Sequence, residues 1–421
     1  MNPINENYHL RDLGYSNADN TVEVPRHRWY FYKEGFSPNL VEHAIEISEI
    51  GKNDIILDPF NGSGTTTLTA TLKGFKSIGI EVNPFTSYLS SAKLKNANLK
   101  KFKKNKDELL SGAEKGAKSN LLGFSSFSKS EGIDKWLFND EILNSFQGGW
   151  NYTSKISSYN LRKLFRLSLI IAAMKNCNAT RDGKCLRYRV SWKDYNFDKQ
   201  SFLESLSDKL DQMIEDIEQY PIPPNATIIN ADSREALNGK EQVEKFSLCI
   251  TSPPYLNTFD YTDIYRPELF LGKFVNSRQE LYNLRLHTVR SHVQAKWKLP
   301  ILNEFGLMYN KAMSQIKENQ EDLMHKNIPT MIQAYFEDMY HFFKLLKSRA
   351  KKNASLWMVV SNSAYAGVEV PVDLILGDIG SKAGWYLKEI GVLRYLKKRK
   401  TKYSSNITQL RETVIIFSAS K

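Results

Sequence analysis

The segment from residue 54 to residue 81 constrains the fold more than any other part of the chain. The apolar run DIIL (54–57) suits a buried parallel strand and leads directly into the Gly-rich turn DPFNGSGTTT (58–67). A helix is expected from about Thr65 to Leu72, followed after Gly74 by a second strand, 77–81. This β-turn-α-β unit predicts a Rossmann-like, doubly wound, mostly parallel α/β sheet.

Further elements are predicted on both sides of this unit. Ser37 and Pro38 are typical of a helix start, because a hydroxyl caps free N–H groups and proline suits the first helical position. The remaining apolar patterns predict strands at 226–231, 246–251 and 356–361, a helix at 331–346, and a closing strand pair at 385–395 and 412–418.

These elements predict one sheet domain with two insertions. Residues 1–98 form its N-terminal part with the Gly-rich turn, 99–224 a largely helical insertion, and 225–421 the remainder, with a smaller insertion at 257–329. The stretch 93–120 has nine lysines against three acids and is expected to be a solvated helix face or a linker.

Charge and cysteine content limit the functional classes. The chain has 58 Lys and Arg residues and 46 Asp and Glu residues, so its net charge is 58 − 46 = +12. This charge favours a polyanionic partner, although it could merely keep the protein soluble. Three cysteines cannot form a disulfide framework, so a reducing compartment is expected. The longest strongly apolar run, 167–174, is far short of the ~20 residues that span a bilayer. The N-terminal residues have no secretory pattern, so we expect a soluble, intracellular protein.

The acids around the Gly-rich turn indicate its ligand. Gly62 and Gly64 let backbone N–H groups approach a ligand at a helix N-terminus. Asp58 precedes the turn and no GK[ST] follows, so a phosphate is disfavoured and a positively charged amino group is favoured. Glu81 ends the second strand, where an acid accepts hydrogen bonds from ribose hydroxyls. S-adenosylmethionine fits both acids; two acids that only cap strand ends are the alternative.

A second motif, TSPPY (251–255), follows the strand predicted at 246–251. Consecutive prolines have fixed φ and no N–H, so their carbonyls are held rigidly. Ser252 and the carbonyl of Pro253 can accept both hydrogens of an exocyclic amino group, while Tyr255 stacks on the base. A base inside a duplex cannot reach such a site, so base flipping is implied. A stiff turn with a packing tyrosine is the alternative.

Together, DPFNGSGTT, GIEVNPF and TSPPY resemble the amino-group DNA methyltransferases, which methylate adenine-N6 or cytosine-N4 with S-adenosylmethionine. Further segments resemble the family's cofactor-flanking segment, third-strand acid and last strand: YKEGFSP (32–38), NADS (230–233) and LRETVIIF (410–417). The resemblance covers about 25–98 and 226–270, and more weakly 331 to the end, but neither insertion.

This resemblance implies roles for individual residues. The cofactor is expected to lie against Phe36, Ser37, Asp58, Phe60, Gly62, Ser63, Gly64, Thr65, Glu81, Val82, Asp232 and Ser233. Within that set, Asp58 would take the amino group, Glu81 the ribose hydroxyls and Asp232 the adenine amino group. Methyl transfer, with S-adenosylhomocysteine as product, is assigned to Ser252, Pro253, Pro254 and Tyr255. Alignment of the methyl and the amine would supply much of the rate without a covalent enzyme intermediate.

The cysteines exclude one related chemistry, and arginines indicate DNA contacts. Methylation at cytosine carbon-5 needs a thiolate, typically in a Pro-Cys pair, and no cysteine here follows proline. No zinc-ligand spacing is present, so no metal is predicted. DNA contact is expected first within 140–220 and second within 257–329, with the candidates Arg181, Lys184, Arg187, Arg189, Trp192 and Arg290. The basic stretch 394–402 is a further candidate.

Serine before Pro-Pro leans, by the resemblance, toward cytosine-N4, and a sequence-specific modification enzyme for double-stranded DNA is expected. Adenine-N6 methylation, RNA methylation, an inactive DNA-binding subunit and an NAD-binding dehydrogenase are the alternatives. A cognate restriction endonuclease would be a separate protein. The expected location is the cytoplasm of a prokaryote or phage-infected cell, in association with the nucleoid.

Overall fold

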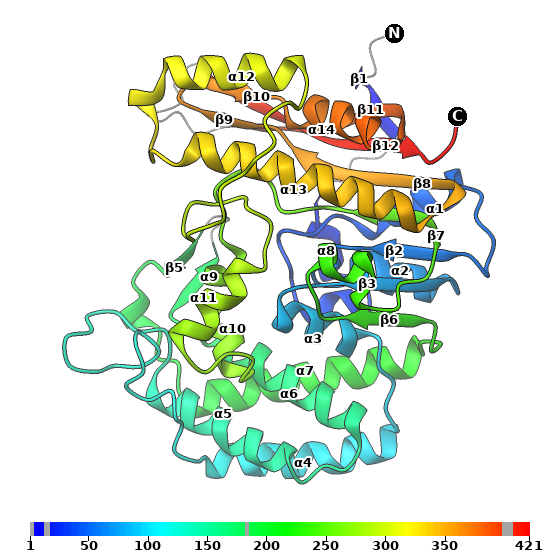
Figure 1. Ribbon diagram of the computed structural model, residues 1–421. Helices are drawn as coiled ribbons and strands as arrows, with labels where there is room; N and C mark the ends of the chain where they lie inside the picture. The colour runs from blue at the N-terminus through cyan, green and yellow to red at the C-terminus, as the bar shows by residue number, and fades with distance from the viewer. Residues whose placement is uncertain (1–3, 12–16, 182–184, 398–406) are drawn as a thin grey trace.

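An eight-stranded sheet forms the centre of the protein, whose computed structural model describes residues 4–11, 17–181, 185–397 and 407–421 (Figure 1). In spatial order its strands are β1 (Ile4–Asn5), β11 (Tyr386–Lys397), β12 (Gln409–Ser418), β8 (Ala350–Ser361), β7 (Phe246–Thr251), β2 (Ile55–Asp58), β3 (Lys76–Ile80) and β6 (Ala226–Ile229). β12 is antiparallel to both of its neighbours, and every other adjacent pair is parallel. The predicted doubly wound, mostly parallel α/β sheet is therefore confirmed.

Helices cover both faces of this sheet. The α-helices are α1 (Pro38–Ile47), α2 (Thr65–Leu72), α3 (Pro84–Lys93), α4 (Leu99–Lys115), α5 (Asp140–Thr153), α6 (Tyr159–Lys175), α7 (Lys199–Gln219), α8 (Ser233–Glu235), α9 (Tyr261–Ile264), α10 (Arg266–Leu271), α11 (Arg278–Leu286), α12 (Leu307–Glu318), α13 (Ile328–Arg349) and α14 (Val372–Lys382). Two short hairpins pair β4 (Ala179–Arg181) with β5 (Leu186–Tyr188) and β9 (Ser363–Tyr365) with β10 (Val368–Val370).

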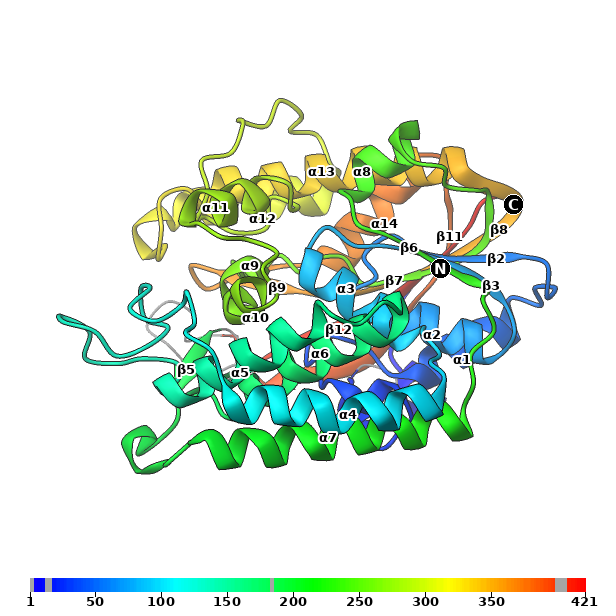
Figure 2. The same cartoon turned by 90° about the horizontal axis from the view of Figure 1, so that it is seen from below.

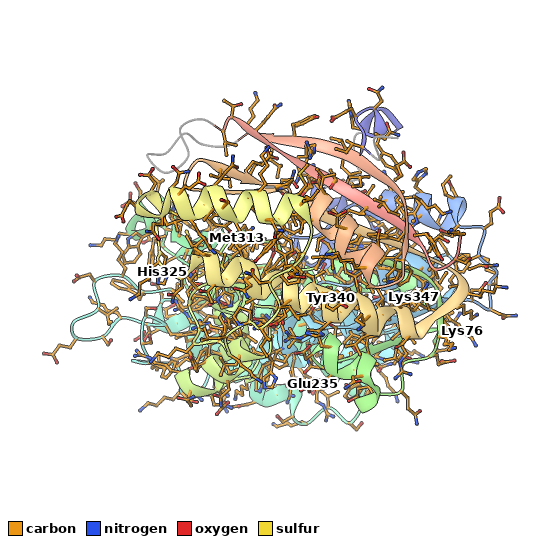
Figure 3. The ribbon with its side chains drawn as sticks, turned by 45° about the horizontal axis from the view of Figure 1, so that its top comes forward. Lys76, Glu235, Met313, His325, Tyr340 and Lys347 are labelled. Carbon is orange, nitrogen blue, oxygen red and sulfur yellow. The ribbon has the colours of Figure 1, made fainter. Side chains whose placement is uncertain are left out.

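Alternate residues of the central strands serve opposite cores, as the two-residue period of a strand requires. Ile56 of β2 belongs to a core with Leu40 of α1 and Ala70 of α2. Its neighbours Ile55 and Leu57 belong to the core on the other face, which α12, α13 and α14 help to form. Figure 3 shows α13 lying across that face, with its labelled Tyr340 and Lys347 partly exposed.

The large insertion forms a helical layer below the sheet in Figure 1, and Figure 2 shows α4 and α7 running side by side. Its core includes Phe102 of α4, Phe165 of α6 and Phe202 of α7. Most lysines of α4 are exposed, which agrees with the predicted solvated helix face. Lys93, at the end of α3, is an exception because it is buried, and burial lowers its pKa to about 7.

The smaller insertion joins the helical layer to the sheet domain. Phe270 of α10 belongs to the core of the helical layer, whereas Val289 and Tyr309 belong to the core under α13. The predicted smaller insertion, residues 257–329, therefore contains the four helices α9 to α12. Within the described residues, no helix is long and apolar enough to cross a membrane.

The helical layer depends on one close backbone approach. A Cβ at Gly148 of α5 would lie 2.3 Å from the carbonyl oxygen of Gly112 and 2.6 Å from the Cα of Gly116. Gly148→Ala is expected to lower the free energy of unfolding by about 1–3 kcal/mol, measured by urea denaturation, because α4 and α5 must separate. Ser111→Ala, on the exposed side of α4, is the control and should change it by less than about 0.5 kcal/mol. Equal midpoints for the two variants would contradict this view of the packing.

Candidate active site

A cavity of about 290 Å³ opens at the carboxyl ends of β2 and β7. Here the sheet changes its winding direction, since β2 leads to β3 and β6 on one side and β7 leads to β8 on the other. Such switch points are where open α/β sheets bind ligands. The predicted residues that line it are Phe36, Asp58, Phe60, Gly62, Ser63, Thr65, Glu81, Val82, Asp232, Ser233, Ser252, Pro253, Pro254 and Tyr255. Two motifs about 190 residues apart in the sequence thus meet in one cavity.

Ser37 and Gly64, the other two predicted residues, are not among those that line the cavity. Ser37 is fully buried and caps α1, since its hydroxyl oxygen accepts hydrogen bonds from the backbone of Asn39 and the side chain of Asn20. Gly64 has φ of 86° and begins α2, and a Cβ there would lie 2.8 Å from the Cβ of Ser90. Both residues shape the helices that border the cavity.

Asp58 ends β2 and is 2% exposed. Its Oδ1 accepts a hydrogen bond from Thr251 Oγ1 at 2.7 Å and one from the Phe60 backbone N–H at 3.1 Å. Burial raises the pKa of this carboxyl to about 6, although these hydrogen bonds favour its charged form. No cation pairs with it within the part of the chain that the structure describes.

Glu81 follows β3 and holds the Gly-rich turn from the other side. Its two carboxylate oxygens accept hydrogen bonds from the backbone N–H groups of Gly62 at 2.7 Å and Asn83 at 2.8 Å. Burial raises its pKa to about 7, and the nearby charge of Asp58 adds to the shift. A ligand with a positive charge and hydroxyl groups would therefore meet two acids that have no cationic partner among the described residues.

Asp232, at the start of α8, has a cation partner of its own. Arg234 contacts its Oδ2 at 2.6 Å and also contacts Asp338 of α13 at 3.0 Å. The Asp232 side chain remains on the cavity wall, with Ser233 beside it. Its carboxylate is oriented by Arg234 before any ligand is present.

The TSPPY segment leaves β7 at the same edge of the sheet. The Ser252 hydroxyl donates to the backbone carbonyl of Val359 at 3.2 Å, and the Tyr255 hydroxyl donates to Glu412 at 3.0 Å. Because the Ser252 hydroxyl donates its hydrogen bond to Val359, its oxygen lone pairs can act as acceptors toward a ligand. The arrangement presents hydrogen-bond acceptors, as capture of an amino group requires.

Sequence reasoning missed several residues that line this cavity: Tyr32, Glu34, Tyr261, Arg394 and Glu412. Tyr32, Glu34 and Glu412 lie inside segments already singled out, YKEGFSP and LRETVIIF, so their motif membership was an available signal. Tyr261 and Arg394 lie in no such motif, and only the fold brings them to the cavity.

The residues predicted to contact DNA lie in different settings. Arg181 forms an ion pair with the buried Glu268, and Arg290 contacts Glu337 at 2.7 Å and Asp338 at 2.8 Å. These partners hold both guanidinium groups inside the protein, because releasing either one would strand buried carboxylates. Both side chains therefore have structural partners in this fold.

The other candidates lie on or near the hairpin of β4 and β5. Arg187 has an exposed side chain. Arg189 donates to the carbonyl of Cys177 at 2.8 Å, and the ring of Trp192 meets that of Trp136 at 4.6 Å. Lys184 lies outside the described residues. Burial raises the pKa of the Cys177 thiol to about 12.

Comparisons with known proteins show which proteins this chain resembles. The sequence model of a family described as DNA methylase, of the N6/N4 type, matches residues 3–92. The Type II methyltransferase M.BsoBI of Geobacillus stearothermophilus is 29% identical over 89% of this chain and 81% of its own length. M.AvaI of Nostoc sp. (strain PCC 7120) is 26% identical over 88% and 81%, respectively. These matches support the N6/N4 amino-methyltransferase family for this chain.

Among solved structures, the rRNA methyltransferase aviRa from Streptomyces viridochromogenes aligns with 91% of this chain and 86% of its own, at 12% identity and a TM-score of 0.29. An overlap this loose carries no argument about fold or substrate. The fold assignment here depends on the strand order itself.

An amino-methyltransferase takes its methyl group from S-adenosylmethionine. The cavity fits that cofactor, because the buried Asp58 and the half-buried Glu81 are carboxylates with no cation partner among the described residues. The individual roles stay predictions: Asp58 would take the amino group of the cofactor, Glu81 its ribose hydroxyls and Asp232 its adenine amino group.

Asp58→Asn is expected to weaken S-adenosylmethionine binding more than tenfold at pH 8, measured by calorimetry. For the wild type, affinity should rise between pH 5 and pH 8, because Asp58, with its pKa raised to about 6, must lose its proton to attract the ammonium group. The variant should show a smaller rise, which Glu81 alone causes. A pH dependence identical in the two proteins would contradict the role of Asp58.

The same substitution should stabilise the cofactor-free protein. A raised carboxyl pKa means that the folded state keeps a proton that the unfolded state releases, so stability is lost as pH rises from about 4 through about 6. Removing the charge should restore up to about 3 kcal/mol at pH 7.5, at about 1.4 kcal/mol per pKa unit. Asp54→Asn is the control with opposite sign, since ion pairing with Lys351 lowers the pKa of Asp54 to about 2.

Proposed function

We propose that this protein transfers a methyl group from S-adenosylmethionine to the exocyclic amino group of a flipped-out base in double-stranded DNA, at cytosine-N4. The observation that carries the proposal is the set of acceptors at the end of β7, fixed beside the cofactor acid Asp58. The Ser252 hydroxyl and the Pro253 carbonyl would accept the two amino hydrogens, and Tyr255 would stack on the base.

The main contribution of the protein to the reaction would be to align the amine nitrogen with the methyl group. When bound, S-adenosylmethionine supplies a methyl group on a positively charged sulfur, and transfer breaks the sulfur–carbon bond, forms a nitrogen–carbon bond and releases one amine proton. Ser252 and Pro253 would turn the nitrogen lone pair toward the methyl, at the close approach that in-line displacement needs. The hydrogen bond from Thr251 to Asp58 would hold the base site and the cofactor site at a fixed separation.

Duplex DNA as the substrate is supported by the relatives, whose names describe Type II methyltransferases, and by the net charge of +12. Exposed cations for the phosphates would come from Arg187 and Lys193 near β5 and from Lys33 at the cavity. A cognate endonuclease would be a separate partner, and the enzyme would act on the chromosome in a prokaryotic cytoplasm.

The choice of cytosine-N4 over adenine-N6 is supported by the serine before Pro-Pro. In the family that this chain resembles, serine at this position favours cytosine as the target base. Labelled methyl transfer to genomic DNA, followed by digestion to nucleosides, tests the choice. Recovery of N4-methylcytosine is the expected result, and recovery of N6-methyladenine would refute it. Transfer to RNA in preference to duplex DNA would refute the substrate class.

Ser252→Ala and Tyr255→Ala are expected to lower kcat by at least about 100-fold while changing S-adenosylmethionine affinity less than threefold. The reason is that both side chains orient the base, and neither is assigned to the cofactor. Single-turnover methylation of plasmid DNA and calorimetry supply the two measurements. Glu46→Ala, exposed on α1 and outside the cavity lining, is the control and should retain kcat. Full turnover in either test variant would remove the segment from the mechanism.

A further inference from the structure

Three side chains from three strands form a hydrogen-bonded chain on the cavity wall. Tyr255, beyond β7, donates its hydroxyl to Oε1 of Glu412 on β12 at 3.0 Å. Arg394 on β11 donates its Nε to Oε2 of the same carboxylate at 2.6 Å. Arg394 and Glu412 are also directly paired in the strand register. One carboxylate therefore orients both the stacking tyrosine and an arginine.

The two terminal NH₂ groups of Arg394 have no hydrogen-bond partner among the described residues and could donate to a ligand. Its side chain is 40% exposed, and it is the only arginine on the cavity wall among the described residues. Its Nε is used by Glu412, whereas no hydrogen bond within the described residues involves its two terminal NH₂ groups. By contrast, Arg290 uses its terminal groups on Glu337, Asp338 and the carbonyl of Lys298.

The sheet sets the distance between these donors and the acceptors of TSPPY. Ser252 follows β7, and Arg394 lies on β11, three strands away in the order β7-β8-β12-β11. Three strand spacings amount to about 14 Å between the two backbones. A planar base and the arginine side chain together can fill that interval, with the amino group of the base at Ser252 and its opposite end at Arg394.

We propose that Arg394 is a specificity-determining residue that donates to N3 and O2 of the target cytosine. This inference deepens the proposed function and depends on it. Cytosine has an amino group, N3 and O2 in a row along one edge, so acceptors at Ser252 and Pro253 followed by two donors at Arg394 match all three. Adenine has its amino group and N1, but then a C2–H, which would leave one arginine donor facing carbon. A site built to hydrogen-bond an acceptor discriminates strongly against a base that lacks it.

Glu412 is the positioning residue in this arrangement. It is 3% exposed, and its carboxylate holds the guanidinium through Nε, which leaves the two terminal NH₂ groups without a partner among the described residues. A purely structural cross-strand ion pair would stabilise the sheet equally for every substrate. The two roles therefore differ in whether Arg394 affects the choice of base.

The test uses the full-length enzyme and duplexes that contain the target site located by sequencing methylated DNA. The target cytosine is compared with 3-deazacytosine, which keeps the amino group and O2 but lacks the N3 acceptor. For the wild type, kcat/KM should be at least about tenfold higher on cytosine. For Arg394→Met, kcat/KM on cytosine should fall at least about 30-fold and the preference should shrink to within about threefold. Intrinsic reactivity of the analogue cancels, because both proteins act on the same two duplexes.

Arg411→Met is the matched control. Arg411 lies on β12 and pairs with the buried Asp373, but it is not among the residues that line the cavity. Its removal should leave the preference for cytosine over 3-deazacytosine at the wild-type value, even if stability falls. Cofactor affinity, measured by calorimetry, should be unchanged in the Arg394 variant.

Equal losses on both duplexes for Arg394→Met would overturn the proposal and leave the arginine a structural role. Failure of the proposed function is visible separately, in the wild-type reaction alone. If that reaction yields N6-methyladenine, or no methylated base, the cytosine assignment falls and the pairing with N3 and O2 falls with it.

Discussion

The hydrogen bond from Thr251 to Asp58 is the interaction on which the active site depends. Both residues are almost fully buried, at the ends of the two adjacent parallel strands β7 and β2. The register pairs Leu57 with Cys249, so it brings the last residues of the two strands to the same edge. Because β2 continues into the Gly-rich turn and β7 into TSPPY, the bond fixes the separation between these two segments. Shape changes elsewhere in the chain can leave that separation untouched.

The two acids of the cofactor site are placed at a cost to the folded chain. Asp58 is buried and Glu81 half-buried, neither has a cation partner among the described residues, and desolvation raises both pKa values. A cationic ligand offsets much of the desolvation free energy of these carboxylates when it binds. The stability that the cofactor-free fold lacks therefore contributes to the binding free energy of the ligand. Glu81 also receives hydrogen bonds from the backbone on both sides of the cofactor turn, at Gly62 and Asn83. The acid is thus held in position before the cofactor arrives.

Local patterns predicted the parts of the fold whose causes are local. The helix expected at 65–72 is α2, and the residues of the Gly-rich turn and TSPPY line one cavity, although their individual roles stay predictions. Distant partners were not predictable. Arg181 resembled a DNA contact because its partner Glu268 lies 87 residues away, and the arm at residues 4–5 pairs with β11 through backbone groups that carry no sequence signal. Arg394 was included only in a basic stretch considered for DNA contact, because its exposure to the cavity depends on the order of four strands.

Arg290 shows why an arginine near aromatic residues is weak support for DNA binding. It ends a chain of alternating charges in which Asp232 contacts Arg234, Arg234 contacts Asp338, and Asp338 contacts Arg290. Arg234 also donates to the carbonyls of His287 and Thr288, which line the cavity. This wall of the cavity is therefore fixed by the same charges that orient the Asp232 carboxylate. In contrast, Arg394 on β11 has only its Nε engaged among the described residues, so the part of the lining that it forms is less constrained.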